Sequence, residues 1–358
     1  MSALRDLVFV SAGLDLDGGG RALAGRLLAG ACAGFARERG LGFEVLALGR
    51  SGGPADARYF GEDQRGLALR VWQRQWRDRR AAYVFDLLGP ARIQAFLPSG
   101  VRAPYLVALH GIEVWRPLSW DRRRALARAA VQLAFSSYTV ERAWPFCPRL
   151  DRLASLPLAL EERERAGPVD EALLGRLGEG FLLIVGRMAS GERYKGHDQM
   201  LEAMPRLPDT RLVVVGDGDD RRRLEARAAA LGLNGSVIFT GFVSETTLAE
   251  LYRRCSVFVM PSTGEGFGLV YLEAMRAGKP CVAARGSAAE EIVVDGTTGL
   301  LVSQEPGELA SAVGTLLREP ELGRRMGEAG HRRWRDELGA DRFQERLRPV
   351  LERLTCAA

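Results

Sequence analysis

Few residues in this chain are of the kinds that cross-link small secreted domains or bind transition metals. Only five of its 358 residues are cysteine and three are histidine, and they are scattered without a C-x-x-C spacing. We therefore expect free thiols in a reducing compartment and no resident metal. No apolar run approaches the length of about 18 residues that indicates a transmembrane helix. The first residues lead directly into a strand pattern instead of a signal peptide, so the sequence predicts a cytoplasmic location.

Lysine is also scarce, and the charge is unevenly placed. Lys195 and Lys279 are the only lysines among 50 basic residues. Residues 1–165 contain 25 basic and 17 acidic side chains, a net charge of +8, whereas the remainder contains 25 and 28, a net charge of −3. A basic half favours an anionic partner, such as a phosphorylated acceptor or the inner face of a membrane. Solvated helix faces in an arginine-rich chain explain the charge equally well, and no recognisable module predicts nucleic-acid binding.

Short apolar runs alternate with longer amphipathic stretches, as is typical of β-α units around parallel sheets. The runs predicted as strands are residues 7–12, 43–48, 83–88, 105–110, 132–137, 181–185, 211–215, 237–240, 257–260 and 281–284. Helices are predicted between them, for example over residues 20–39, 221–231, 246–254 and 268–277. We therefore predict an α/β fold of two doubly wound, Rossmann-like domains, residues 1–160 and 165–339. The domains are expected to face each other across a cleft, with ligands at the carboxyl ends of the strands.

Two glutamates frame the most informative segment. Glu265 lies in a glycine-bearing loop after the apolar run 257–260, and Glu273 lies eight positions later in a predicted helix. The N-terminus of a helix offers free N–H groups and a positive partial charge, which favour an anion such as a diphosphate. Carboxylates beside that anion are suited to accept hydrogen bonds from hydroxyl groups. The segment therefore suits an anionic ligand that is rich in hydroxyl groups, such as a nucleotide sugar.

This segment resembles the E-x7-E signature of retaining glycosyltransferases with the GT-B fold, in particular glycosyltransferase family 4. The resemblance covers most of the chain and is dense from about residue 181 to residue 302. It implies that Glu273 binds the ribose of the donor and that Glu265 contacts the transferred sugar. It also implies that a last helix within residues 340–358 packs back on the first domain. The backbone N–H groups implied to face the sugar and the diphosphate are those of Gly266, Phe267, Gly268 and Leu269.

Two cations follow the first strand of the predicted second domain. Gly186 and Arg187 directly follow the apolar run 181–185. Lys195 comes after a short polar loop and precedes the next helix. Arginine offers a planar fork of donors and lysine a compact charge, so the pair can hold a diphosphate from two directions. The resembling family carries its diphosphate clamp at this G-R…K-G pattern. The resemblance therefore implies that role for Arg187 and Lys195.

Two further segments of the second domain bear on the donor. By resemblance, backbone groups near Phe242 and Val243 read the edge of the base, and Leu248 packs near it. Asp217 and Asp219 form a D-x-D sequence, which holds a divalent ion in a different glycosyltransferase architecture. Because two cationic side chains and a helix N-terminus already offset the diphosphate charge here, we interpret these aspartates as turn and helix-start residues. No essential metal is expected.

In the first domain, a strand runs into Gly18, Gly19 and Gly20 at the start of a predicted helix. Glycines let backbone N–H groups approach a ligand closely, although a simple turn would need them as well. His110 ends the apolar run 105–110 within an H-G-x-E sequence. By resemblance, the glycines touch the donor phosphate or the acceptor, and His110 contacts the transferred sugar near the reaction centre.

Two tryptophans mark a helix in the basic half of the chain. Trp72 and Trp76 are four positions apart, so they share one helix face, and arginines surround them. The pattern is typical of a helix that lies on an anionic membrane. It is equally typical of a helix that buries its tryptophans and turns its arginines outward. The sequence leaves both interpretations open.

Together these features predict a metal-independent enzyme that transfers a hexose-type sugar, with retention of configuration, from a UDP- or GDP-sugar to an acceptor hydroxyl. Arg187 and Lys195 would stabilise the leaving diphosphate, while Glu265 and His110 would orient the sugar. The nucleotide sugar is a substrate, so no cofactor is expected. The expected setting is bacterial cell-envelope polysaccharide or glycolipid synthesis, with an anionic, lipid-linked or saccharide acceptor. A nucleotide-sugar epimerase and a non-catalytic nucleotide-sugar-binding subunit are the alternatives.

Overall fold

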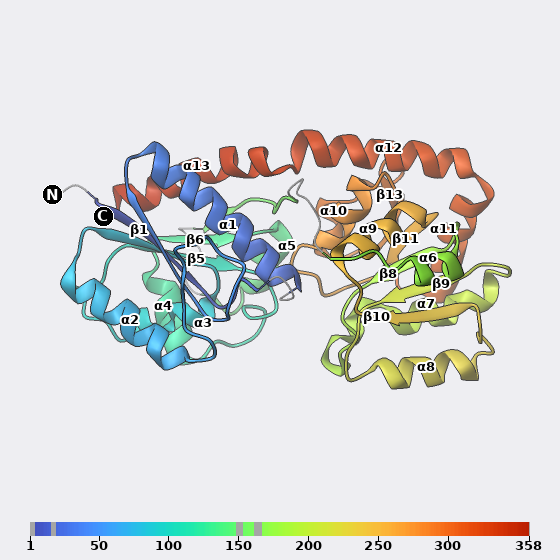
Figure 1. The fold of residues 1–358 in the computed structure, drawn as a ribbon, viewed down its shortest axis with the longest axis horizontal. Helices are drawn as coiled ribbons and strands as arrows, with labels where there is room; N and C mark the ends of the chain where they lie inside the picture. Colours follow the sequence, from blue (N-terminus) through green and yellow to red (C-terminus); the bar gives the residue numbers. More distant parts are fainter. Residues whose placement is uncertain (1–3, 16–18, 148–152, 161–166, 358) are drawn as a thin grey trace. The chain divides into compact units, whose positions relative to one another are not determined.

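The structure, a computed structural model, describes residues 4–15, 19–147, 153–160 and 167–357. The chain divides into two compact units. The first comprises Met1–Glu161 and Ala340–Ala358, and the second comprises Glu162–Gly339. Each unit is a parallel sheet with helices packed on its faces (Figure 1). The predicted α/β class is therefore confirmed, and the units are described in turn.

The first unit contains a seven-stranded parallel sheet in the order β3-β2-β1-β4-β5-β6-β7. Its strands are β1 (Asp6–Ser11), β2 (Gly42–Ala47), β3 (Arg58–Tyr59), β4 (Ala81–Phe85), β5 (Tyr105–Leu109), β6 (Val131–Ala134) and β7 (Leu153–Ser155). Every residue of β4, β5 and β6 is buried. Strands of a parallel sheet that is covered on both faces read as continuous apolar runs, which is why these segments were recognisable in the sequence.

Helices cover both faces of this sheet. They are α1 (Gly19–Glu38), α2 (Gln64–Arg77), α3 (Leu88–Ala91), the 3₁₀ turn η1 (Arg92–Ala95), α4 (Trp120–Arg128), α5 (Ser137–Ala143) and α13 (Ala340–Cys356). The last of these, α13, comes from the far end of the chain and packs against α1. It buries Phe343 and Leu347, and ion pairs join Arg39 to Glu352 and Arg348 to Glu38.

The second unit contains a six-stranded parallel sheet in the order β10-β9-β8-β11-β12-β13. Its strands are β8 (Leu182–Val185), β9 (Leu212–Val215), β10 (Val237–Gly241), β11 (Val257–Met260), β12 (Cys281–Ala284) and β13 (Gly299–Val302). Its α-helices are α6 (Glu171–Leu177), α7 (His197–Ala203), α8 (Arg221–Ala230), α9 (Glu245–Arg254), α10 (Leu269–Arg276), α11 (Pro306–Arg318) and α12 (Pro320–Glu337). Three 3₁₀ turns complete it: η2 (Ser190–Lys195), η3 (Met204–Arg206) and η4 (Ala288–Glu291).

Both sheets reverse their strand order beside one central strand. In the first sheet this point lies between β1 and β4, and in the second it lies between β8 and β11. The loops that leave two such neighbouring strands diverge to opposite faces of the sheet, which opens a crevice at the carboxyl ends of the strands. A ligand site is therefore expected in each unit among the residues that follow these four strands.

Several predicted boundaries were wrong by a few residues, and three strands were not predicted. The run 83–88 extends past the end of β4 because Leu87 and Leu88 lead into α3. The run 132–137 extends past β6 through Phe135 to the two serines that begin α5. Ser136 is not part of a strand: its Oγ accepts a hydrogen bond from the backbone N–H of Thr139 (3.0 Å) and caps α5. The strands β3, β7 and β13 lie at the sheet edges. The first two have only two and three residues, and β13 has four, of which only Gly299 is buried.

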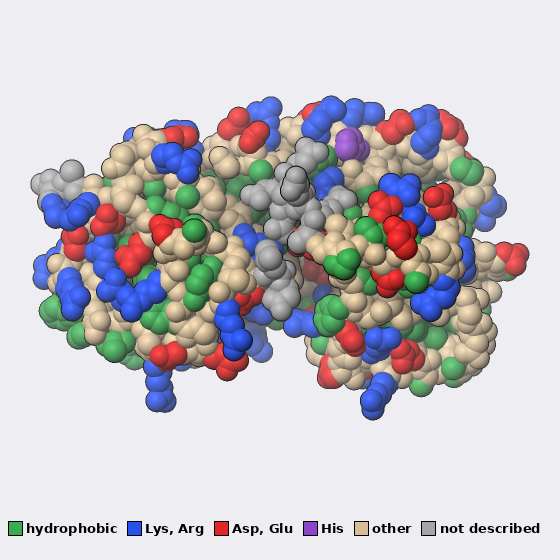
Figure 2. Space-filling view, in the orientation of Figure 1, with side chains coloured by type: hydrophobic (Ala, Val, Ile, Leu, Met, Phe, Trp, Pro, Cys, Tyr) green, Lys and Arg blue, Asp and Glu red, His purple; other side chains and the backbone are tan. Residues whose placement is uncertain are grey.

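Helix α2 settles one of the open sequence interpretations. Trp72 and Trp76 are 38% and 46% exposed, and their ring centroids are 5.6 Å apart. The buried face of the helix consists of Leu67, Val71 and Gln75. The interpretation in which α2 buries its two tryptophans is therefore wrong. Figure 2 shows basic and hydrophobic side chains beside one another over the part of the first unit that contains α2. None of the described helices is long and apolar enough to cross a bilayer.

Candidate active site

The predicted diphosphate clamp lies at the strand reversal of the second unit. Arg187 follows Gly186 directly after β8, and Lys195 ends the 3₁₀ turn η2. A Cβ atom on Gly186 would lie 3.5 Å from Cδ of Lys195 and 3.1 Å from Cε of Met260 at the end of β11. The absence of a side chain at this position therefore lets the aliphatic stem of Lys195 lie against the backbone between the two central strands.

A third residue joins the two cations. Glu192 accepts hydrogen bonds from Nε and Nη2 of Arg187, and the Nε to Oε2 distance is 3.2 Å. The same Oε2 atom lies 3.3 Å from Nζ of Lys195. Burial alone would raise the pKa of Glu192, but both cations favour its charged form and the pKa is lowered. The hydrogen bond to Glu192 likewise raises the pKa of Arg187. Arg187 and Glu192 are therefore charged at neutral pH.

The D-x-D aspartates support the loop that carries the clamp. Asp219 accepts hydrogen bonds from the backbone N–H (2.9 Å) and the hydroxyl (2.5 Å) of Ser190, the first residue of η2. Asp217 accepts a hydrogen bond from the backbone N–H of Gly218 (2.8 Å) and pairs with Arg221 (3.3 Å). Asp217 thus makes contacts within its turn and to the first residue of α8, whereas Asp219 ties that turn to η2 and does not cap α8, whose N-cap residue is Asp220. Among the described residues, no group of three or more His, Cys, Asp or Glu side chains is arranged to hold a metal ion.

The clamp loop is fastened to the loop that leads to Glu265. Gly196 has a φ of +83°, and a Cβ atom there would lie 2.6 Å from the carbonyl oxygen of Pro261. Nε2 of Gln304 donates hydrogen bonds to the carbonyl oxygens of Pro261 (2.5 Å) and Tyr194 (3.0 Å). The backbone N–H of Thr263 also donates to the carbonyl of Tyr194 (3.0 Å). The loops after β8 and β11 thus form one packed body at the predicted ligand edge.

The E-x7-E segment has its first glutamate in this packed loop. Oγ of Ser262, which is fully buried, donates a hydrogen bond to Oε1 of Glu265 (3.2 Å). Gly268 has a φ of +99°, a backbone conformation that favours glycine, and it precedes Leu269 at the start of α10. The hydroxyl of Tyr271 donates to the carbonyl oxygen of Met260 (2.5 Å), which ties the first turn of α10 to the end of β11. The start of the helix is therefore fixed beside the clamp loop.

The remaining residues of this segment lie in the loop before α10 and on the helix itself. Gly266 and Phe267 precede Gly268 in the loop, and the ring of Phe267 is buried. The first turn of an α-helix leaves its N–H groups without partners inside the helix, so the start of α10 can donate to an anion. Glu273 lies on α10 and is half-buried; its Oε2 accepts a hydrogen bond from the hydroxyl of Tyr252 on α9 (2.8 Å). The tyrosine therefore holds the second carboxylate in one orientation.

The residues predicted near the base follow β10. Phe242 and Val243 lie between β10 and α9, and Leu248 lies on α9 and is half-buried. The side chain of Phe242 is 79% exposed and is therefore accessible to a ligand.

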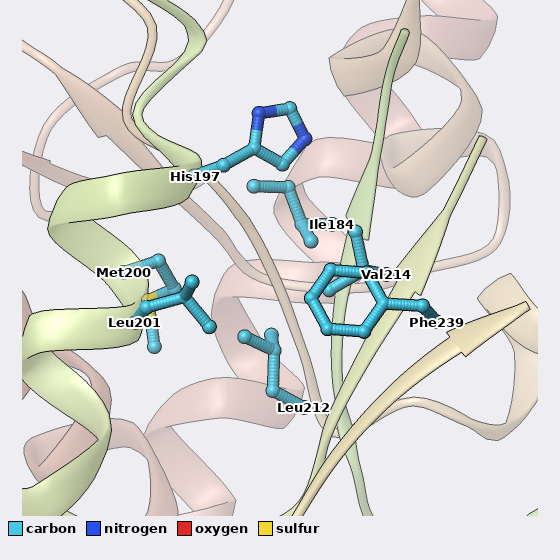
Figure 3. Close-up of a pocket in the computed structure, with 7 residues that line it drawn as sticks. All are labelled: Ile184, His197, Met200, Leu201, Leu212, Val214 and Phe239. Carbon is cyan, nitrogen blue, oxygen red and sulfur yellow. The ribbon is translucent and has the colours of Figure 1, made fainter. Parts of the chain in front are cut away.

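His197 comes two positions after Lys195, and its side chain is buried. Its ring borders a narrow cavity with Ile184, Met200, Leu201, Leu212, Val214 and Phe239 (Figure 3). The Nε2 atom has no hydrogen-bond partner among the described residues. Burial, and secondarily the charge of Lys195, lowers the pKa of His197 to about 4. The imidazole is therefore neutral at neutral pH and adds no charge to the clamp.

In the first unit, His110 follows β5 and is held by three contacts. Nε2 lies 2.7 Å from the backbone oxygen of Asp86, which can only accept, so Nε2 carries the proton and donates. The backbone N–H of His110 donates to Oε1 of Glu113 (2.5 Å), and the ring packs edge-on against Phe135 with centroids 5.0 Å apart. The glutamate of the H-G-x-E sequence thus fixes the backbone beside the histidine.

Asp86 is the most deeply placed carboxylate at the strand reversal of the first unit. It follows β4 and accepts hydrogen bonds from Oγ of Ser11 (2.5 Å), the last residue of β1, and from the backbone N–H of Ala12 (3.0 Å), the next residue. A Cβ atom on Gly25 of α1 would lie 3.1 Å from its Oδ2 atom. Burial raises the pKa of Asp86 to about 6, against the opposing effect of the Ser11 and Ala12 hydrogen bonds.

The structure describes two of the three glycines predicted to contact a ligand in the first unit. Gly18 lies outside the described residues. Gly19 and Gly20 form the first two positions of α1 instead of a separate loop, and both are exposed. Gly19 has a φ of +67°, which favours glycine at this position.

Glu192 and Asp86 were not singled out in the sequence. Asp86 carried a usable signal, because it is a polar residue directly after an apolar strand, as His110 is. Glu192 carried none, because its importance depends on the two side chains that it joins.

The family model described as glycosyl transferases group 1 matches residues 171–333. A GDP-mannose-dependent alpha-(1-6)-phosphatidylinositol monomannoside mannosyltransferase of Mycolicibacterium smegmatis is 34% identical over 288 residues, which are 75% of this chain and 72% of that protein. An alpha-D-kanosaminyltransferase of Streptomyces kanamyceticus is 32% identical over 229 residues, 58% of this chain and 56% of that protein.

Solved structures resemble the chain over nearly its whole length. HepE of Anabaena, in complex with UDP and glucose, has a TM-score of 0.76 and covers 97% of this chain and 99% of its own. Sucrose-phosphate synthase of Thermosynechococcus elongatus has a TM-score of 0.80 and covers 99% and 100%. Both are 20% identical, so they show the fold, which is GT-B. Because the mannosyltransferase is matched over most of its length at 34% identity, the chain belongs to the family of glycosyl transferases group 1.

Proposed function

We propose that the second unit binds a UDP- or GDP-sugar and that the protein transfers its hexose-type sugar to an acceptor hydroxyl with retention of configuration, as in glycosyltransferase family 4. The observation that carries the proposal is the packing of the loops after β8 and β11. Gly196 contacts Pro261, and Gln304 bonds to both loops. The fold therefore brings the loops of the cations and of the E-x7-E segment together, although they lie far apart in the sequence, and this supports their assignment to one donor site.

The chemistry follows from where charge grows during the reaction. As the bond to the sugar lengthens, negative charge collects on the leaving diphosphate and positive charge on the sugar ring. Arg187 and Lys195 stabilise the first, and they are in place before the reaction, which makes this stabilisation effective. Glu265, with support from Ser262, orients the sugar. We propose that the leaving phosphate takes the acceptor proton on the face from which it departs, so that configuration is retained.

The proposed reaction uses no essential metal and no cofactor. A divalent ion would neutralise the diphosphate in other glycosyltransferases, but here two side-chain cations and the start of α10 are available for that purpose. The D-x-D carboxylates that could bind such an ion already accept hydrogen bonds from η2 and from their own turn.

The similar proteins suggest which nucleotide the donor contains, and the charge of the first half of the chain suggests the class of acceptor. One relative is named for GDP-mannose and one solved structure holds UDP, so both bases are tested. The first half of the chain is basic, with 25 basic and 17 acidic side chains in residues 1–165. We propose an anionic, lipid-linked or saccharide acceptor of bacterial cell-envelope synthesis. Peripheral membrane contact would use α2, where Trp72 and Trp76 are half-exposed.

The proposal is tested by thermal unfolding with UDP-, GDP-, ADP- and dTDP-sugars in the presence of a chelator. A ligand at 100 times its dissociation constant adds about 2.7 kcal/mol of stability. We expect stabilisation by UDP- or GDP-sugars that is lost in Lys195→Ala, followed by nucleotide release that depends on an acceptor. Conversion of the sugar without an acceptor would indicate an epimerase. Binding without any turnover would indicate a non-catalytic subunit.

A further inference from the structure

A single carboxylate lies between the two cations of the clamp. Glu192 accepts from Nε and Nη2 of Arg187, which is the paired geometry that arginine uses for carboxylates and phosphates alike. Its Oε2 atom is also 3.3 Å from Nζ of Lys195. The side chains of Glu192 and Lys195 are each 15% exposed, whereas that of Arg187 is 58% exposed. The carboxylate thus accepts from donors of both cations that a diphosphate could also use.

The short segment that carries Glu192 is fixed at both ends. Ser190 is held by Asp219, and the carbonyl of Tyr194 is held by Gln304 and Thr263. Between these ends, Glu192 departs from helical geometry with φ −122° and ψ 28°. The contacts at both ends therefore hold the backbone of η2 in the conformation that directs the Glu192 carboxylate toward Arg187 and Lys195.

We propose that Glu192 is an internal competitor of the diphosphate, which weakens the grip of Arg187 and Lys195 on the nucleoside diphosphate product. This inference rests on the proposed donor site. Two cations and one carboxylate leave the cluster with a net charge of +1, instead of the +2 that the clamp alone would present. The leaving diphosphate is more negative after the sugar bond breaks, so a clamp of full charge would hold the product most tightly. Glu192 limits that attraction and favours product release.

The test is isothermal titration calorimetry of the wild type and Glu192→Gln with UDP, GDP and inorganic pyrophosphate, in the presence of a chelator. Glutamine keeps the size of the side chain and an oxygen that can accept from Arg187, but it removes the charge. We expect Glu192→Gln to bind the nucleoside diphosphate about tenfold more tightly than the wild type. The gain should shrink at high salt. The inhibition constant of the same product should fall by a similar factor in steady-state assays.

Glu250→Gln is the matched control. Glu250 lies on α9 between Arg253 (2.9 Å) and Arg254 (3.7 Å), so it also joins two cations, but it does not touch the clamp. Its affinity for nucleotides should equal that of the wild type. Unchanged or weaker binding by a folded Glu192→Gln protein would overturn the inference and leave the donor site intact. Glu192→Ala provides the same comparison if the glutamine variant does not fold. Failure of both the wild type and the variants to bind any of these probes would overturn the proposed function itself.

Discussion

The two units use the same strand arrangement to build sites of opposite character. In the second unit, the reversal between β8 and β11 carries Arg187 and Lys195, joined by an ionised Glu192. In the first unit, the reversal between β1 and β4 carries the buried Asp86, which accepts from a hydroxyl and a backbone N–H. The comparison teaches that topology fixes where a ligand edge lies, whereas the side chains on the loops decide what it can bind.

A buried titratable group in each unit has a shifted pKa, and the two shifts have opposite directions. The pKa of Asp86 is raised to about 6 and that of His197 is lowered to about 4, mainly by burial in both cases. Burial disfavours the charged form of each group, which is the carboxylate of one and the imidazolium of the other. The two units should therefore respond to acid in opposite directions.

Loss of the lysine in the clamp is expected to have the largest effect. Lys195→Ala removes a preorganised charge from the leaving diphosphate, so kcat should fall by about 100- to 1,000-fold. Steady-state kinetics would measure this. Lys279→Ala is the control, because Lys279 is the only other lysine and precedes β12 at the opposite edge of the sheet. Full turnover in Lys195→Ala would show that the second unit does not hold the reacting phosphate.

The buried histidine of the second unit should make the protein sensitive to acid. The folded-state pKa of His197 is below its usual value of 6.5, so its contribution to stability is complete above pH 6.5 and is lost as the pH falls to about 4. The loss should reach about 3 kcal/mol. His197→Leu, which removes a nitrogen without a described partner, should lack this loss. Urea unfolding of both proteins at several pH values checks it; parallel pH profiles would contradict the assignment.

The buried carboxylate of the first unit should act in the other direction. Because the folded-state pKa of Asp86 is above its usual value of 3.8, its contribution is complete below pH 3.8 and is lost as the pH rises through about 6. The wild type should therefore lose about 2–3 kcal/mol between pH 4 and pH 7 relative to Asp86→Asn. The same urea series measures the difference. A constant gap between the two proteins would mean that Asp86 does not titrate in this range.

Glu273 should have a smaller effect, confined to donor binding. Replacing its carboxylate in Glu273→Gln weakens the proposed contact with the ribose hydroxyls, so the KM for the donor should rise about tenfold with a smaller change in kcat. Tyr252→Phe removes only the hydroxyl that orients Glu273 and should raise KM less. If kcat falls while KM stays constant, Glu273 acts on the reaction and not on the donor.

The sequence predicted the central parts of the fold more accurately than its edges. The strands β8, β9, β11 and β12 were placed within one residue because each is a short apolar run whose residues are all buried. The edge strand β10 was also placed within one residue, although most of its residues are only partly buried. The edge strand β3 has only two residues, so it left no periodic signal. Asp86 and Ser11 are 75 positions apart, and their hydrogen bond depends on the parallel pairing of β1 with β4, which no local pattern encodes.

The candidate site was predictable where a motif marks it. Arg187, Lys195, Glu265 and Glu273 lie on the elements that the sequence predicted for them, and their catalytic roles remain predictions. The link made by Glu192 was not predictable. Glu192 is a polar residue in a polar loop, so the local sequence does not indicate its partners. Its contacts with Arg187 and Lys195 depend on how η2 packs against Gly186.

The most direct test of the account is a crystal structure with the nucleoside diphosphate that stabilises the protein most. We predict that its β-phosphate contacts Arg187 and Lys195, that its ribose contacts Glu273 and that the carboxylate of Glu192 has moved away from at least one cation. A diphosphate held by a metal ion at Asp217 and Asp219, or a nucleotide bound beside Asp86 in the first unit, would contradict the account.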